Sequence, residues 1–121
     1  MNHKVQFVSL EEDDKDLIVS FAISDLDLGI KSLILHRMLF FEEMLDEDER
    51  GVKVSLEDDW FEQEDFNTLV QINISNDEIV VRSTYREYKL DISRIPNADI
   101  EEMVKLLKKQ NHDNRFTINI A

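Results

Sequence analysis

Residues 96–120, PNADIEEMVKLLKKQNHDNRFTINI, decide the fold class because they place one amphipathic helix directly before a strand. Over 97–110, apolar side chains recur at the i, i+3, i+4 and i+7 spacing of a helix, at Ile100, Met103, Val104 and Leu107. Carboxylates fill the first turns of this segment and lysines fill the last, which complements the helix dipole. Residues 116–120 then alternate between apolar and polar, which predicts a final strand.

Upstream of this helix, the sequence predicts an antiparallel sheet. Six segments alternate or are rich in branched and aromatic residues, at 4–10, 17–23, 51–56, 68–74, 78–84 and 88–92. Residues 4–23 are expected to form a hairpin with an acidic turn, and Asn76-Asp77 supplies turn chemistry between two later strands. We expect Val5 and Phe7 to share one face of the first strand. In the segment 68–74, we expect a single face for Val70, Ile72 and Ile74.

Residues 30–45 permit two interpretations. Their apolar residues can share a helical stripe that Arg37 interrupts, or residues 30–37 can form a buried strand. Short apolar runs do not settle this by periodicity. We favour the strand, because Gly29 precedes the run and the run is short.

These elements predict one α+β domain over residues 1–121. A chain of 121 residues is the length of one domain, and its 42% hydrophobic content supplies a core. One proline and two glycines leave no candidate linker. The expected architecture is a mostly antiparallel β-sheet with the helix at about 97–110 packed on it and a C-terminal strand.

The residue inventory predicts no catalytic, cofactor-binding or metal site. Cysteine is absent, and no two of the three histidines have the helical spacing of a zinc pair. Two glycines cannot build a phosphate-cradling loop. Asp46, Asp48, Gly51 and Glu57 match four positions of a calcium-binding loop, but Arg50 occupies a ligand position, where its charge would repel calcium. We therefore do not expect an enzyme.

Location is predicted from what the sequence lacks. No apolar run approaches the roughly 18 residues of a membrane span, and residues 1–5 lead into an alternating segment without the apolar region of a signal peptide. A cytoplasmic location is therefore expected, and no membrane partner.

The charge distribution is the main functional clue. The net charge is −13, and all of it belongs to residues 1–65, which hold 19 acidic and 6 basic residues. Three clusters dominate, at 11–16, 42–49 and 57–65. Such a field repels nucleic acid and anionic lipid and attracts a cationic partner, although acidic surfaces also keep proteins soluble.

The second and third clusters are the candidate partner-binding surface. They flank the short strand at 52–56, so we expect the chain to bring both to one edge, whereas 11–14 is expected to be a plain hairpin turn. An aromatic pair inside the third cluster is a candidate anchor for an interface. The predicted binding residues are Glu42, Glu43, Asp46, Glu47, Asp48, Glu49, Glu57, Asp58, Asp59, Trp60, Phe61, Glu62, Glu64 and Asp65.

In size, acidity and α+β character over the whole chain, the sequence resembles the small immunity proteins of bacterial contact-dependent inhibition and related polymorphic toxin systems. No specific motif carries this resemblance, so it assigns no role to any residue. It implies an inhibitor that neutralises a basic toxin, for example a nuclease, by direct binding. Two alternatives stay open: a nucleic-acid mimic that occupies a DNA-binding channel, and a structural or adaptor domain. The sequence does not indicate the oligomeric state.

Overall fold

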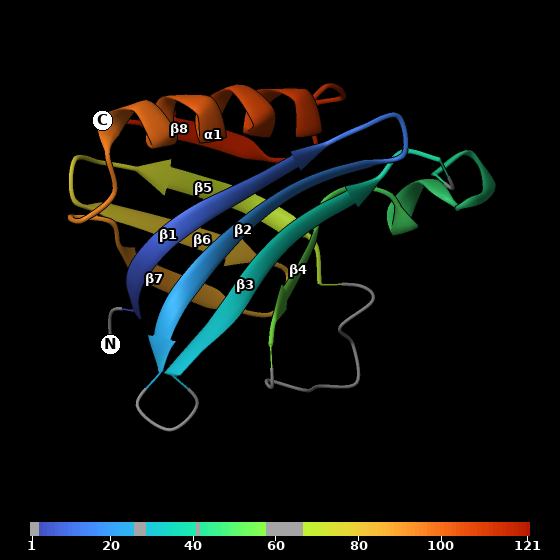
Figure 1. Ribbon diagram of the computed structural model, residues 1–121. Coiled ribbons are helices and arrows are strands. Elements are labelled where there is room, and N and C mark those ends of the chain that lie inside the picture. Colours follow the sequence, from blue (N-terminus) through green and yellow to red (C-terminus); the bar gives the residue numbers. More distant parts are fainter. Residues whose placement is uncertain (1–2, 26–28, 41, 58–66) are drawn as a thin grey trace.

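The computed structural model describes residues 3–25, 29–40, 42–57 and 67–121, and over these residues it confirms the α+β class (Figure 1). Eight strands form a mostly antiparallel sheet in the order β4-β3-β2-β1-β7-β6-β5-β8, with the helix α1 packed on it. The elements are β1 (His3–Glu12), β2 (Asp16–Asp25), β3 (Gly29–Met38), η1 (Glu42–Met44), η2 (Glu47–Glu49), β4 (Lys53–Leu56), β5 (Leu69–Ile74), β6 (Glu78–Ser83), β7 (Glu87–Asp91), α1 (Asn97–Gln110) and β8 (Thr117–Ile120).

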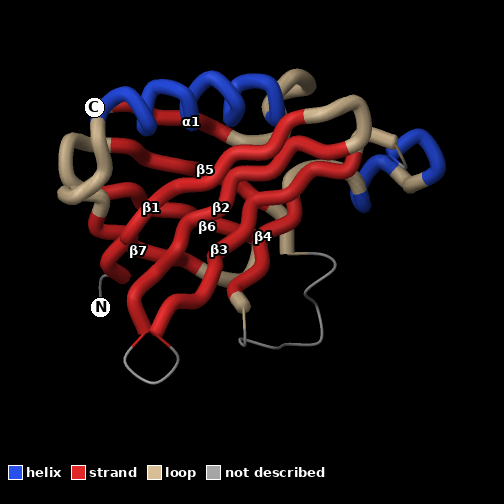
Figure 2. The backbone as a smooth tube through the Cα atoms, in the orientation of Figure 1, coloured by secondary structure: helices blue, strands red, loops and turns tan. Residues whose placement is uncertain are grey.

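The sheet consists of two four-stranded halves that face each other across the core. The halves meet where β1 runs parallel to β7, with His3 opposite Leu90. On the far side, the sheet curls until the β4 edge reaches the chain before β5. There the Val54 N–H donates to the Asn67 carbonyl at 2.8 Å. The helix lies along the remaining open side, above the strands (Figures 1 and 2). The core therefore lies inside the curl, and the outer faces of both halves remain uncovered by the described elements.

The helix has the predicted bounds, and its burial extends the predicted stripe. Met103 and Leu107 are fully buried, as expected, whereas Ile100 and Val104 are only partly buried. The helix also buries Leu106 and, at its last residue, Gln110. The buried face is therefore rotated towards the Leu106 side relative to the predicted stripe.

Two register shifts correct the predicted faces of the first and fifth strands. The pairing of β1 with β2 shifts between Val5 and Phe7, so Val5 points into the core whereas Phe7 is 53% exposed. The pairing of β5 with β6 shifts between Leu69 and Gln71, and Val70 is consequently 44% exposed. In each strand an extra residue reverses the alternation, because a bulge places two residues opposite one.

The strand interpretation of residues 30–37 is confirmed, because β3 pairs with β2 along its whole length. Alternation along this strand directs Leu33 and Leu35 into the core, and it directs Arg37 inward as well. The arginine that interrupts the helical interpretation is thus a buried residue, with 1% of its surface exposed. None of the described helices is long and apolar enough to cross a membrane.

Candidate functional site

Two acidic clusters that are far apart in sequence meet at one end of the sheet. Asp16 pairs with Met38, so the chain leaving β3 runs beside the β1–β2 turn. The Leu39 N–H donates to the Lys15 carbonyl at 2.7 Å, and the Lys15 ammonium lies 5.6 Å from the centre of the Phe40 ring. These contacts place the segment that carries η1 and η2 next to the turn (Figure 1).

We call this region the acidic end, and define it by its exposed carboxylates that form no ion pair with another described residue: Glu11, Asp13, Asp14, Glu43 and Asp46. The backbone N–H groups of Lys15 and Asp16 both donate to the Asp13 carboxylate at 2.8 Å and lower the pKa of this aspartate. The carboxylate therefore stays ionised and shapes the turn. The sequence-based expectation treated 11–14 as a plain turn, whereas the structure places it beside the 42–49 cluster.

The acidic end is fastened to the fold by Arg37. Its guanidinium donates to both carboxylate oxygens of Glu42 at 2.6 and 2.7 Å and to both of Asp113 at 2.8 and 2.9 Å. A further bond of 2.7 Å goes to the carbonyl of Gln110 in the last turn of α1. All five N–H donors of the arginine are thus satisfied. Arg37 therefore joins β3, η1 and the C-terminal end of the helix.

The charges of this cluster stabilise one another. Burial disfavours the charged form of Arg37, but the hydrogen bonds and charges of Asp113 and Glu42 outweigh it and raise the pKa of the guanidinium. The hydrogen bonds from Arg37 hold the pKa of Asp113 well below its usual range, and Arg115 adds to this effect at 2.5 Å. Arg115 also donates to the Glu47 carbonyl at 2.8 Å and so fastens η2.

The predicted binding residues in 42–49 therefore differ in availability. Glu42 is only 12% exposed and is held by Arg37, and Glu49 is half-buried, whereas Glu43 and Asp46 face solvent. Glu47 is 89% exposed, with its carboxylate 3.7 Å from Arg115. The backbone of Asp48 lies in η2, and its side chain is outside the described residues.

The third cluster starts at the opposite end of β4. Glu57 is exposed and follows the last residue of this strand, whereas η2 precedes its first. Four strand residues span about 13 Å, so Glu57 does not join the acidic end. Both clusters flank β4, an edge strand, but Glu57 is the one described carboxylate of the third cluster, so the expectation that the two clusters share one edge stays a prediction. The remaining predicted residues, Asp58, Asp59, Trp60, Phe61, Glu62, Glu64 and Asp65, lie outside the described residues.

Asn67 fixes the chain where it returns from this segment. Its side chain is fully buried, donates to the Val54 carbonyl at 3.0 Å and accepts the Tyr85 N–H at 3.1 Å. Glu57 is fixed as well, because its N–H donates to the Ser32 carbonyl at 2.9 Å. Both ends of the 57–67 segment are thus attached to the sheet near β4.

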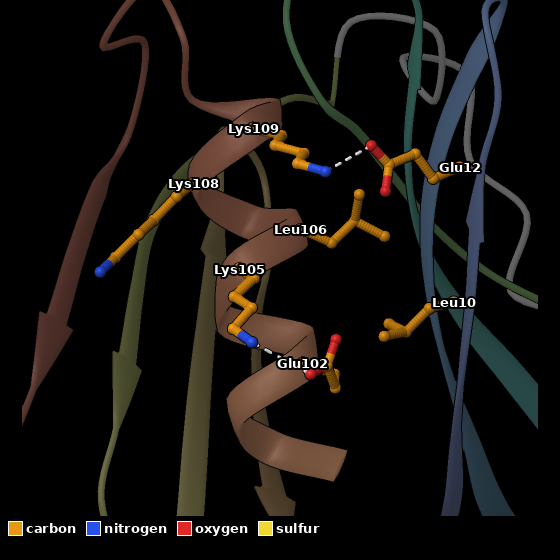
Figure 3. A pocket seen from close by; sticks show the side chains of 7 residues that line it. All are labelled: Leu10, Glu12, Glu102, Lys105, Leu106, Lys108 and Lys109. Atoms are coloured by element: carbon orange, nitrogen blue, oxygen red, sulfur yellow. Dashed lines mark hydrogen bonds and ion pairs between the residues drawn. The ribbon is translucent and has the colours of Figure 1, made fainter. Parts of the chain in front are cut away.

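A groove of about 530 Å³ lies between α1 and β1 (Figure 3). Leu10 and Leu106 line it, and two ion pairs border it. One joins Lys109 to Glu12 at 2.6 Å, and the other joins Lys105 to Glu102, one helix turn away, at 3.2 Å. Lys108 points away from the other lining side chains in this view. The lysines of the groove place positive charge next to the acidic end. The two carboxylates that line the groove, Glu12 and Glu102, are each paired with a lysine.

Metal ligation is not suggested by the described residues, in which no three His, Asp or Glu side chains are grouped to hold an ion. His36, a half-buried residue of β3, pairs with Asp16 at 2.8 Å.

No protein-family model matches the chain, and searches of the curated proteins and of the solved structures return no match. Function is therefore argued from charge and geometry.

Proposed function

We propose that this protein is an acidic inhibitor that binds a basic protein directly, in the manner of an immunity protein that neutralises a toxin such as a nuclease. The observation that carries the proposal is the acidic end, where Glu11, Asp13, Asp14, Glu43 and Asp46 form no ion pair with a described residue and lie on two distant segments that the bond from Leu39 to Lys15 holds side by side. Solubility alone does not require this concentration of charge. A basic partner would supply the missing positive charges.

The way the acidic end is held supports binding. Arg37 and Arg115 fix the segment that carries η1 and η2 to the helix and the sheet. Little conformational freedom of this segment is therefore left to lose on association. Complementary charge also accelerates association by steering the partner before contact. A nuclease needs positive charge where it holds phosphate, which makes its active face a suitable partner for such a surface.

The proposal is favoured over nucleic-acid mimicry by the arrangement of the carboxylates. A mimic of the DNA backbone needs acidic groups in a long, regular series, because phosphates repeat at a constant spacing along each strand. The carboxylates of the acidic end come instead from a hairpin turn and from the loop that carries two short 3-10 helices. They form a compact cluster, which suits a compact patch of Lys and Arg side chains.

A capture experiment followed by inhibition tests this function. The tagged protein is incubated with an extract of its source cells at low ionic strength, and any retained protein is identified, produced separately and assayed for binding and for nuclease or other toxic activity. We expect a basic protein that binds with 1:1 stoichiometry and loses activity when saturated. Failure to retain any basic protein, or full activity in the saturated complex, would contradict the proposal. The paired variant E43K/D46K should bind weakly, whereas E87K/E101K, with the same change in charge, should bind like wild type.

A further inference from the structure

The outer face of the β1–β4 half-sheet has an unusual composition for this protein. In β2, Leu17, Val19, Phe21 and Ile23 point into the core, so the residues between them point outward; of these, Ala22 is itself only 4% exposed. The strand register aligns the outward residues of the neighbouring strands with those of β2. We call this surface the neutral face, and define it as Phe7, Ser9, Ile18, Ser20, Ala22, Ser24, Ile30, Ser32, Ile34 and Ser55. Ten outward residues of a chain with net charge −13 thus carry no charge.

The most exposed apolar residues of this face are Phe7, at 53%, and Ile30, at 51%. Phe7 is opposite Ala22, which in turn is opposite Ser32, so small side chains surround the ring along that row. No described element covers these residues, since α1 packs on the open side of the curl. An exposed aromatic ring among small, uncharged side chains is typical of the centre of a protein interface.

The outer face of the other half-sheet provides an internal comparison. Apart from Val70 and Val80, its outward residues are polar or charged, and they include Gln71, Asn73, Arg82, Glu87, Lys89 and Asn119. Several of them bond across strands, as Arg82 does to Gln71 at 3.1 Å and Asn119 to Asn73 at 2.7 Å. The outer face of the half-sheet formed by β5, β6, β7 and β8 is therefore suited to contact with solvent. The difference therefore belongs to the β1–β4 half and is not a general property of the sheet.

Size and charge distinguish between two occupants of the neutral face. Four strands and seven residues along β2 span about 19 by 23 Å, or roughly 400 Å². A stable interface buries about 800 Å² per partner, so the face alone is too small to hold a second copy of this chain. Two copies, each with a net charge of −13, would also repel each other.

A basic partner gains the additional area from the acidic end. Glu11 is opposite Ile18, and His36 and then Lys53 follow in the same row, so the neutral face borders the acidic end on the β1 side of this row and a lysine on the β4 side. A partner seated on both surfaces has an uncharged centre and a charged margin, which is the usual anatomy of a specific interface.

We infer that the neutral face is the apolar half of the docking surface, and that it takes a basic protein whose apolar patch is bordered on one side by Lys and Arg. This inference rests on the proposed function and adds to it the surface that gives the complex its specificity. In this arrangement the acidic end directs the encounter, and Phe7 and Ile30 provide the contact that keeps the complex together.

The test uses the basic protein identified by capture, purified, as the probe. Phe7→Ser and Ile30→Ser remove the apolar side chains from the neutral face. Val70→Ser and Ile120→Ser are the matched controls, because these residues of the other half-sheet are 44% and 58% exposed. We expect each face variant to raise Kd about tenfold or more, the usual effect of losing a central anchor, without changing the dependence on salt. The controls should stay within about twofold of wild type.

Several outcomes overturn the inference. A probe that binds wild type and the face variants equally would refute it and leave the proposed function standing. A wild-type protein that binds no basic probe would refute the proposed function, and this inference with it. Sedimentation that shows a wild-type dimer, dissociated by Phe7→Ser, would assign the face to a second copy instead. Thermal melts of all four variants, expected to match wild type because the residues are exposed, exclude unfolding as the cause.

Discussion

Replacing Arg37 with methionine should destabilise the fold more than any change at an exposed arginine. The side chain is 1% exposed and donates five hydrogen bonds to Glu42, Asp113 and Gln110. Methionine fills much of the same volume but leaves the Glu42 carboxylate and a helix carbonyl without their donor, and it leaves Asp113 with Arg115 alone. Breaking a buried ion pair on one side costs about 3–5 kcal/mol, a large part of the total stability of a domain this size.

The loss is measured by urea unfolding followed by far-ultraviolet circular dichroism, with Arg94→Met as the matched control because Arg94 is exposed. The control should change the free energy of unfolding by less than about 0.5 kcal/mol. The combined variant R37M/E42Q/D113N should be less destabilised than R37M alone, since neither position 42 nor position 113 then carries an unpaired carboxylate, and Arg115 keeps its contacts with Glu47. A cost for R37M below about 1 kcal/mol would refute this account of the cluster, because breaking a buried pair is expected to cost several times more.

Three further predictions concern stability. The pKa of Asp113 in the folded protein lies below its ordinary value of 3.8, so the stability that Asp113 contributes is present above about pH 4 and is lost as the pH falls through the lower folded value. Asp113→Asn should therefore be less stable than wild type at pH 7. It should also lose less stability than wild type on acidification below pH 4, as measured by the midpoints of urea unfolding. Leu107→Ala should cost about 2–5 kcal/mol, whereas Lys108→Ala, on the exposed face of α1, should be nearly neutral; a loss below about 0.5 kcal/mol at Leu107 would mean that the helix is peripheral. Thermal melts with EDTA and with added calcium should coincide, and a rise of several degrees with calcium would revive the loop from Asp46 to Glu57.

Periodicity was sufficient to predict most of the elements. The helix at 97–110 has a stripe at helical spacing, charges ordered along its dipole and a proline before it, and its bounds were correct. The strands at 78–84 and 88–92 alternate without interruption, and their inward residues Ile79, Val81, Tyr88 and Leu90 are buried as expected. Local rules succeed here because each segment repeats one period.

The errors arose where one residue breaks the period or where a partner is distant in sequence. The register shifts after Val5 and beside Val70 have no signal such as a glycine, so the pattern alone placed Phe7 and Val70 inward. Arg37 lies 76 positions from Asp113, and no local rule joins them. One signal was nevertheless available: once 30–37 is taken as a strand, alternation with Leu33 and Leu35 directs Arg37 inward, and a buried arginine requires acidic partners.

The same reasoning explains what was missed in the candidate site. The sequence separates the clusters at 11–16 and 42–49 by more than 25 residues, and only the pairing of β2 with β3 brings them together. The neutral face could not be predicted from the sequence for a similar reason. Its residues are spread over four strands, and only the register of these strands brings them together.

The central claim is that the acidic end directs the binding of a basic protein, and the dependence of the association rate on ionic strength tests it most directly. Stopped-flow rates with the captured basic protein are measured from low to high salt for wild type, for E43K/D46K and for E87K/E101K, the last two having equal net charge. We predict that the wild-type rate falls by an order of magnitude or more as salt rises, and that E43K/D46K associates slowly at every salt concentration while E87K/E101K stays close to wild type. Equal slowing by the two pairs of substitutions, or a wild-type rate independent of salt, would contradict the claim.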